Sequence, residues 1–213
     1  MLQPNLALIT HKREELDLPY SHFLVTDKMS EHGCLSGKTT SYQFPLYLYN
    51  NDEEVKISKK IPSTIMMLFD KPKQGYMAKK PNINPELFEE LSKKYNKRPS
   101  PEEIFFYIYA ILYSNIYRQK YQEFLKIDFP RAPFTQNYQL FKKMAKLGGQ
   151  LVDLHLLKSN NLNNPKVKFY GQEGDNTIKF RKYNKEKQRL YINEQKYFKP
   201  MSEEIWKYMI GGY

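Results

Sequence analysis

Three short apolar runs bounded by polar residues mark the first part of the chain and predict β-strands. They cover residues 5–10, 21–27 and 44–49, and Pro45 places the third run at a sheet edge or at the start of a strand. Residues 28–43, between the second and third runs, are rich in glycine, serine and threonine and predict a long loop. Loops of this length inside a compact domain are usually functional or disordered, so the loop is a candidate binding element.

The middle of the chain has helical periodicity and helix-capping residues. Asn84 and Ser100, each followed by proline, predict the N-caps of two helices. The second helix is apolar on nearly all sides as far as Ser114, which predicts a buried central helix that breaks there. Prolines exclude helix over residues 128–134, and Thr135 is the predicted N-cap of a third, longer helix.

The other segments are a weakly patterned stretch and a tail with β character. Residues 50–83 combine polar runs with proline and glycine, and predict an irregular linker or an insertion. In the tail, residues 166–170, 176–183 and 188–198 predict strands separated by turns. Ser202 predicts the start of a last short helix that continues to the glycines near the end of the chain.

Together these elements predict an α+β fold, in which a central helical bundle is flanked by short N-terminal and C-terminal β segments. A length of 213 residues predicts one domain. Residues 1–83 form its strand and loop part, residues 84–160 its helical part, and residues 161–213 a β-hairpin part with a terminal helix. No apolar run reaches the roughly 18 residues of a membrane span and the N-terminus lacks the apolar core of a secretory signal, so we expect a cytoplasmic location and no membrane partner.

The charge of the chain points to a polyanionic partner. Lysine and arginine number 34 against 23 acidic residues, a net charge of +11 (34 − 23). A folded domain with this excess attracts polyanions, of which nucleic acid is the commonest. A solvated surface that binds nothing is the equally weighted alternative from charge alone. The lone cysteine, Cys34, excludes an intrachain disulfide and a cysteine-based zinc site.

The motif most suggestive of catalysis is HGCLSGKTT, at residues 32–40. Residues 37–39 match the end of a phosphate-binding loop, but His32 stands where the first glycine is required. A strand pattern also follows where such a loop needs a helix. Nucleotide hydrolysis is therefore a minor alternative. The other histidines and acidic residues have no catalytic or metal-binding spacing, and His155 predicts a hydrogen-bonded core histidine.

Polar and basic side chains remain as candidates for a binding site. The loop offers donors and acceptors of the kind that read base edges, with a plain mobile loop as the alternative. The candidates for groove contacts are Lys38, Thr39, Ser41 and Gln43. An arginine between two prolines, a basic helix and a basic late hairpin have the chemistry of phosphate contacts, with a helix cap and solvated surfaces as the alternatives. The candidates for phosphate contacts are Arg131, Lys142, Lys143, Lys179, Arg181 and Lys182.

Several segments occur in an order typical of a known family. After NLALI, HFLVTD and FPLYLYN come PSPEEIFFYIYAILYSNIYRQKYQEFLKIDFPRAPFT, LFKKMAKLGGQLVDLHLL and YINEQKYFKPMSEEIWKYMIGGY. In this order they resemble the C-terminal specificity region of Type ISP and related single-chain restriction–modification enzymes, from about Pro4 to Tyr213. The most specific parts of the resemblance are EFLKIDFPRAPF and IWKYMIGGY.

The resemblance implies that the chain reads a short asymmetric sequence in double-stranded DNA and holds the duplex against an adenine-specific methyltransferase, which flips the target base. The partners would be the methyltransferase and helicase/nuclease domains of the parent enzyme. S-adenosylmethionine, ATP and Mg²⁺ would serve those domains, and this chain would bind no cofactor. Because the catalytic motifs are missing here, the resemblance implies a non-catalytic part that directs methylation and cleavage in phage defence. The alternative is a basic helical scaffold that binds RNA or an acidic protein.

Overall fold

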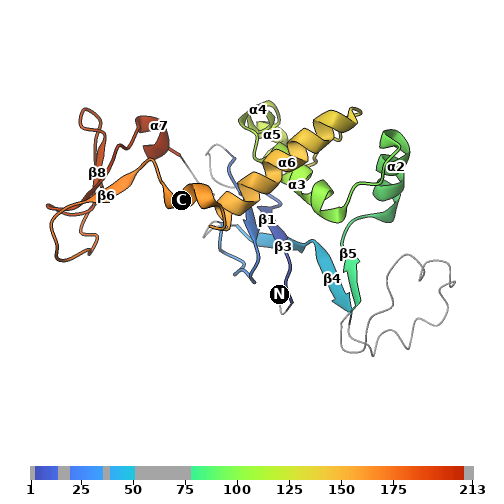
Figure 1. Cartoon of the computed structure of the whole chain (residues 1–213), viewed down its shortest axis with the longest axis horizontal. Helices are drawn as coiled ribbons and strands as arrows, with labels where there is room; N and C mark the ends of the chain where they lie inside the picture. Colours follow the sequence, from blue (N-terminus) through green and yellow to red (C-terminus); the bar gives the residue numbers. More distant parts are fainter. Residues whose placement is uncertain (1–2, 14–19, 36–38, 51–77, 209–213) are drawn as a thin grey trace.

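The computed structural model describes residues 3–13, 20–35, 39–50 and 78–208, and Figure 1 shows their arrangement. Three predicted apolar runs are confirmed as strands of an antiparallel sheet in the order β2-β1-β3. These strands are β1 (Ala7–His11), β2 (Phe23–Thr26) and β3 (Ser41–Pro45). The strand β3 lies at an edge of this sheet, as its proline predicts.

The third apolar run contains a strand break that the prediction of one strand missed. Leu46 is buried between β3 and the next strand, β4 (Tyr47–Asn50), which leaves the sheet and pairs with β5 (Ala78–Pro81). Residues 78–81 are thus a strand, which corrects the prediction of an irregular segment over 50–83 for that part. Its residues 51–77 lie outside the described residues.

The predicted helices form where capping side chains begin them. Asn84 caps α2 (Pro85–Tyr95), and Ser100 caps α3 (Pro101–Leu112) in a reciprocal capping box with Glu103. The predicted break at Ser114 is confirmed, since Ser114 caps a separate short helix. The short helices that follow are α4 (Asn115–Lys120) and α5 (Gln122–Leu125).

The long helix α6 (Tyr138–His155) begins two residues later than predicted. Its N-cap is Asn137, whose side chain accepts a hydrogen bond from the Leu140 backbone N–H at 3.1 Å. The prediction of Thr135 as the cap is wrong. The Thr135 hydroxyl instead accepts a hydrogen bond from the backbone N–H of Asn137 at 3.1 Å, which stabilises the turn before the helix.

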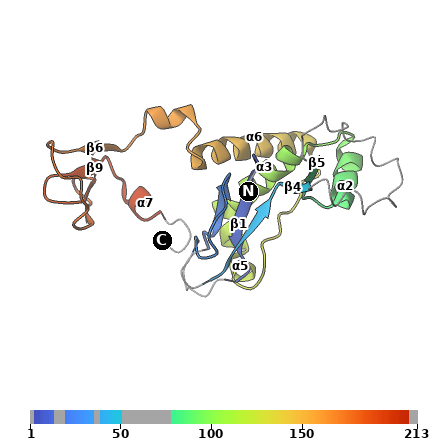
Figure 2. The same cartoon turned by 90° about the horizontal axis from the view of Figure 1, so that it is seen from below.

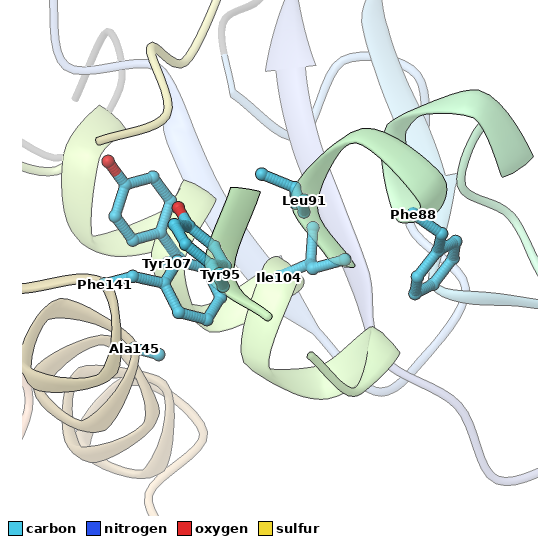
Figure 3. Packing of buried hydrophobic residues seen from close by; sticks show 7 residues of the cluster. All are labelled: Phe88, Leu91, Tyr95, Ile104, Tyr107, Phe141 and Ala145. Carbon is cyan, nitrogen blue, oxygen red and sulfur yellow. The ribbon is translucent and has the colours of Figure 1, made fainter. Parts of the chain in front are cut away.

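The core surrounds α3, which is covered on one side by the sheet and on another by α6 (Figure 2). Figure 3 shows Tyr95 of α2, Tyr107 of α3 and Phe141 of α6 grouped together. The Phe141 ring centroid lies 5.0 Å from that of Tyr107 and 5.1 Å from that of Tyr95. Val25 of β2 lies in a buried cluster that includes Tyr109 on α3. The Phe- and Tyr-rich helix is therefore buried, as predicted.

A second sheet follows α6 and the short 3-10 helix η2 (Asn160–Asn163). Its four antiparallel strands have the order β6-β9-β8-β7. They are β6 (Lys168–Tyr170), β7 (Lys182–Asn184), β8 (Arg189–Tyr191) and β9 (Tyr197–Lys199). Figure 1 shows this sheet at one end of the molecule, away from α2 at the other end. The last helix, α7 (Glu203–Trp206), begins after Ser202 as predicted but ends earlier, at Trp206.

Helices combined with antiparallel sheets make this an α+β fold, as predicted. The central feature of the described helices is the close pairing of α3 with α6. The central helical bundle remains a prediction. The division of the domain into residues 1–83, 84–160 and 161–213 also remains a prediction. No described helix is long and apolar enough to cross a membrane.

The close pairing of α3 and α6 predicts a strong effect at Gly148. A Cβ atom there would fall against the backbone carbonyl of Phe106, which cannot move without displacing α3. We expect Gly148→Ala to lower the free energy of unfolding by about 2–3 kcal/mol, as measured by chemical denaturation. Gly149→Ala is the matched control, since the nearest atoms to its Cβ belong to the side chain of Phe106, at 3.3 Å, and not to the backbone, and helix propensity favours alanine. Equal losses in the two variants would contradict this account of the packing.

Candidate nucleic-acid interface

The loop between β2 and β3, residues 27–40, is attached to the sheet by Gln43. The Gln43 amide nitrogen donates to the Lys28 carbonyl at 2.8 Å. Its amide oxygen accepts from the backbone N–H of Ser30 at 3.0 Å and from the Ser30 hydroxyl at 2.9 Å. The first half of the loop therefore has a defined position over the β3 edge of the sheet.

The described residues at the end of the loop are attached to His11, a fully buried residue of β1. The Thr39 hydroxyl lies 2.7 Å from His11 Nδ1, and the Ser41 hydroxyl lies 3.3 Å from His11 Nε2. Ser41 also accepts a hydrogen bond from the backbone N–H of Leu35 at 3.3 Å. Thr39, Ser41 and Gln43 are thus brought together around one loop, where each contacts protein groups. The fourth candidate of this set, Lys38, lies outside the described residues.

His11 rests on a second buried histidine. The His22 ring of the segment before β2 stacks on it, with 4.6 Å between the centroids, and Tyr20 contacts His22 edge-on. Burial, together with the nearby His11 and Arg118, lowers the pKa of His22 to about 4. His22 is therefore neutral near pH 7, because burial and the neighbouring basic groups disfavour its charged form.

Arg131 lies in the proline-rich segment 128–134, whose backbone is fixed by tyrosines of the helices. The hydroxyl of Tyr117 donates to the Arg131 carbonyl at 2.8 Å, and that of Tyr107 donates to the Pro133 carbonyl at 2.8 Å. The Arg131 side chain is 90% exposed and forms an ion pair with Asp128 at 3.7 Å. A fixed backbone thus presents a guanidinium to solvent, which suits a phosphate contact.

The remaining candidates lie on two elements. Lys142 and Lys143 are exposed on the first half of α6, where Lys142 forms an ion pair with Glu103 of the α3 capping box. The others are exposed at the C-terminal sheet, and these are Lys179, Arg181 and Lys182. The backbone N–H of Lys179 donates to the Ile192 carbonyl at 2.8 Å, so the chain before β7 stays next to the chain that follows β8. The described candidates therefore form separate groups on the loop and β3, on the proline-rich segment, on α6 and at the second sheet.

Sequence reasoning missed the strand residues that share a face with Lys182. The register places Lys182 opposite Tyr191, and Tyr191 opposite Tyr197. Residues at alternate positions of each strand project on the same side as these three. The signal is present in KFY, RLY and YFK, where cationic and aromatic residues stand two apart, but three-residue strands are too short for a register to be assigned from sequence.

The side chains and motifs that could suggest catalysis have structural explanations. His155 is half-buried and hydrogen-bonded to the Tyr109 hydroxyl through Nδ1 at 2.6 Å, as predicted. Within the described ranges, no group of three or more histidine, cysteine or acidic side chains is arranged to hold a metal ion. The chain after Thr39 enters strand β3 and not a helix, as predicted, so the surroundings of a phosphate-binding loop are missing at this point.

Comparisons with known proteins add a family and a shared fold. A model of the Type ISP C-terminal specificity domain matches residues 1–213. No curated protein matches the chain.

Three solved structures have the same fold. The ATP-dependent Type ISP restriction-modification enzyme LlaBIII bound to DNA matches with a TM-score of 0.66 and 23% identity, over 99% of this chain and 12% of that chain. The DrdV–DNA complex solved by cryo-electron microscopy matches with a TM-score of 0.67 and 20% identity, over 98% and 19%. A nuclease-deletion mutant of the Type ISP enzyme LlaGI in complex with a DNA substrate mimic matches with a TM-score of 0.61 and 22% identity, over 99% and 16%. The chain spans less than a fifth of each of these proteins.

Buried His22 predicts a loss of stability in mild acid. The unfolded chain takes up a proton at His22 near pH 6.5, whereas the folded chain does so only near pH 4. The free energy of unfolding should therefore fall as the pH drops from 6.5 to 5, by up to about 2 kcal/mol from this residue. Urea denaturation of the wild type and of His22→Phe at several pH values tests this. The variant should show a smaller slope, and an unchanged slope would assign the effect to other groups.

Proposed function

This chain belongs to the Type ISP C-terminal specificity domain family, and from that premise we propose that it recognises a short sequence in double-stranded DNA for a restriction–modification enzyme. The observation that carries the proposal is the match of the family model to the whole chain. The net charge of +11 supports it, because phosphate neutralisation supplies much of the affinity of DNA-binding proteins.

The catalytic steps belong, in this proposal, to other parts of the enzyme. The solved proteins of the same fold are five to eight times longer than the matched region, as the covered shares of 12–19% imply. The proposed partners are a methyltransferase domain and helicase/nuclease domains, which use S-adenosylmethionine, ATP and Mg²⁺. The present chain positions the target adenine for the methyltransferase and directs where cleavage occurs, in the cytoplasm, without making or breaking bonds.

The proposed contacts divide into base reading and phosphate binding. The loop of residues 27–40 and the adjoining strand β3 carry the base-reading role, with Lys38, Thr39, Ser41 and Gln43 as its candidates. Gln43 supports this role by holding Ser30 and Lys28 in place, because a preorganised loop loses less entropy on binding. The phosphate contacts are assigned to Arg131, Lys142, Lys143, Lys179, Arg181 and Lys182.

An exchange of domains tests the proposed function directly. Replacing residues 1–213 in the parent enzyme by the equivalent domain of a relative should transfer the relative's choice of methylated adenines. The measurement is sequencing of methylated adenines in genomic DNA from cells that express each enzyme. An enzyme whose pattern of modified sites is the same before and after the exchange would contradict the proposal. Binding that prefers RNA, or that ignores duplex sequence, would favour the basic scaffold instead.

The assigned roles of single residues predict two different patterns of loss. Gln43→Ala should weaken binding to the target duplex by roughly tenfold, about 1–2 kcal/mol, with little effect on random duplex, because the loop loses its attachment. Lys143→Ala should weaken both duplexes alike, since a phosphate contact has no sequence preference. Fluorescence anisotropy with both duplexes measures the two ratios. An equal loss on target and random DNA for Gln43→Ala would remove it from the base-reading set.

A further inference from the structure

The second sheet has two chemically different faces. Side chains of directly paired residues lie on one face, as do residues two apart along a strand. The face that contains Lys182 therefore consists of two parallel rows across the four strands. One row is Lys168, Lys199, Arg189 and Asn184, and the other is Tyr170, Tyr197, Tyr191 and Lys182. We call this surface the cationic face.

The ring contacts agree with this assignment. The rings of Tyr170 and Tyr197 are stacked with centroids 5.8 Å apart, and Tyr191 lies 5.4 Å from Tyr197. The guanidinium of Arg189 lies 4.4 Å from the centre of the Tyr197 ring, and the Lys199 ammonium lies 4.6 Å from that of Tyr170. The tyrosines thus hold the cations of the neighbouring row in place.

The opposite face is apolar and partly covered. Phe169 and Phe198 contact each other there, with ring centroids 4.8 Å apart. Tyr183 stacks on Trp206 of α7 at 5.6 Å, and its hydroxyl donates to the Met201 carbonyl at 3.0 Å. The acidic first turn of α7 lies near this face, where Glu203 forms an ion pair with Lys185 at 2.6 Å. The contact of the sheet with α7 is therefore on the apolar face.

The cationic face concentrates charge that the described protein does not neutralise. Lys168 and Lys199 are direct cross-strand partners, and the register places Arg189 next to Lys199. Like charges in such positions destabilise a sheet. The eight residues of the face include no Asp or Glu, and the ion pairs found among the described residues do not involve its four cations. A bound polyanion would relieve this repulsion.

The tyrosines favour phosphate over bases as the contacted group. Base stacking needs a free ring face. Here Tyr170 and Tyr197 cover each other and are covered by Lys199 and Arg189. The Tyr191 hydroxyl accepts a hydrogen bond from Arg189 at 3.3 Å. The hydroxyls of Tyr170 and Tyr197 have no hydrogen-bond partner among the described residues, so they are available as donors. Lys168, Lys182 and Tyr170 are exposed, and Lys199, Arg189 and Tyr197 are half-buried beside them. Cations and hydroxyls that reach solvent beside one another have the chemistry of a phosphate contact.

We propose that the cationic face of the second sheet binds the sugar–phosphate backbone of the DNA duplex. The proposal deepens the proposed function and rests on it. The three cations of the first row span about 10 Å across the strands, and the tyrosine row runs about 7 Å from it. The face supplies affinity and orientation, while sequence preference comes from elsewhere in the domain.

The test compares two double variants that remove equal charge from the full chain. Lys168→Gln with Lys199→Gln removes two cations of the face. Lys93→Gln with Lys94→Gln is the control, since both lysines are exposed on α2 at the opposite end of the molecule (Figure 1). Dissociation constants for the target duplex and for a random duplex are measured from 0.05 to 0.3 M salt, with thermal unfolding of each variant.

The two variants should differ in binding and in stability. Each lost phosphate contact reduces the salt slope by about 0.9, so the face variant should lose about 1.8 in slope and bind roughly 30-fold more weakly at 0.15 M salt, on both duplexes alike. Its melting temperature should stay equal to that of the wild type or rise, because repulsion is removed. The control should keep the wild-type slope.

Two results would overturn the proposal. One is a face variant that keeps the wild-type salt slope, or loses no more than the control, while the wild type binds duplex DNA. The other is a lower melting temperature that accounts for the weaker binding, because it would make the lysines structural. Failure of the proposed function gives a different result, in which the wild type itself shows no preference for a duplex sequence.

Discussion

The burial of α3 between the first sheet and α6 is the contact on which the other parts of the domain depend. Residues of α3 contribute to all three buried clusters, which places this helix at the centre of the packing. Gly148 of α6 permits the approach because any side chain there would collide with the α3 backbone at Phe106. With α3 in place, the hydroxyl of Tyr107 reaches the backbone of the proline-rich segment that carries Arg131. The same helix supports the sheet whose edge strand holds the loop of residues 27–40.

The candidate DNA-contacting groups share a way of being positioned. Tyrosine hydroxyls fix the backbone beneath Arg131, Gln43 fixes the first half of the loop, and buried His11 holds Thr39 at its end. Buried polar groups that are fully hydrogen-bonded hold one conformation, because each alternative leaves a donor or acceptor unpaired. Such preorganisation suits a domain that discriminates between sequences, since the ordering entropy is lost during folding and not during binding.

The two sheets serve the proposed function in different ways. The first sheet contributes to the core and presents the loop at its edge. The second has only small apolar contacts, and one of its faces carries four cations with three tyrosines. A row of lysines and arginine opposes folding of so small a sheet, and tyrosine contacts offset part of that cost. This balance is typical of a surface selected for binding, where stability and function compete.

Local signals in the chain were sufficient for much of the fold. Asn84, Ser100 and Ser114 cap helices as predicted, since capping depends on a few neighbouring residues and their backbone. Contacts between distant segments were not accessible in this way. Thr135 and Asn137 are both good caps, and the structure shows that Asn137 caps α6 while the Thr135 hydroxyl stabilises the turn before it. Strand register decides the pairing of β4 with β5, the attachment of Gln43 to Ser30 and the two faces of the second sheet. A shift of one residue would move every side chain of a strand to the opposite face. Composition and short-range pattern were therefore enough to predict the charge of the chain and most helix starts. Only long-range packing decided which polar groups form hydrogen bonds within the fold and which cations share one surface.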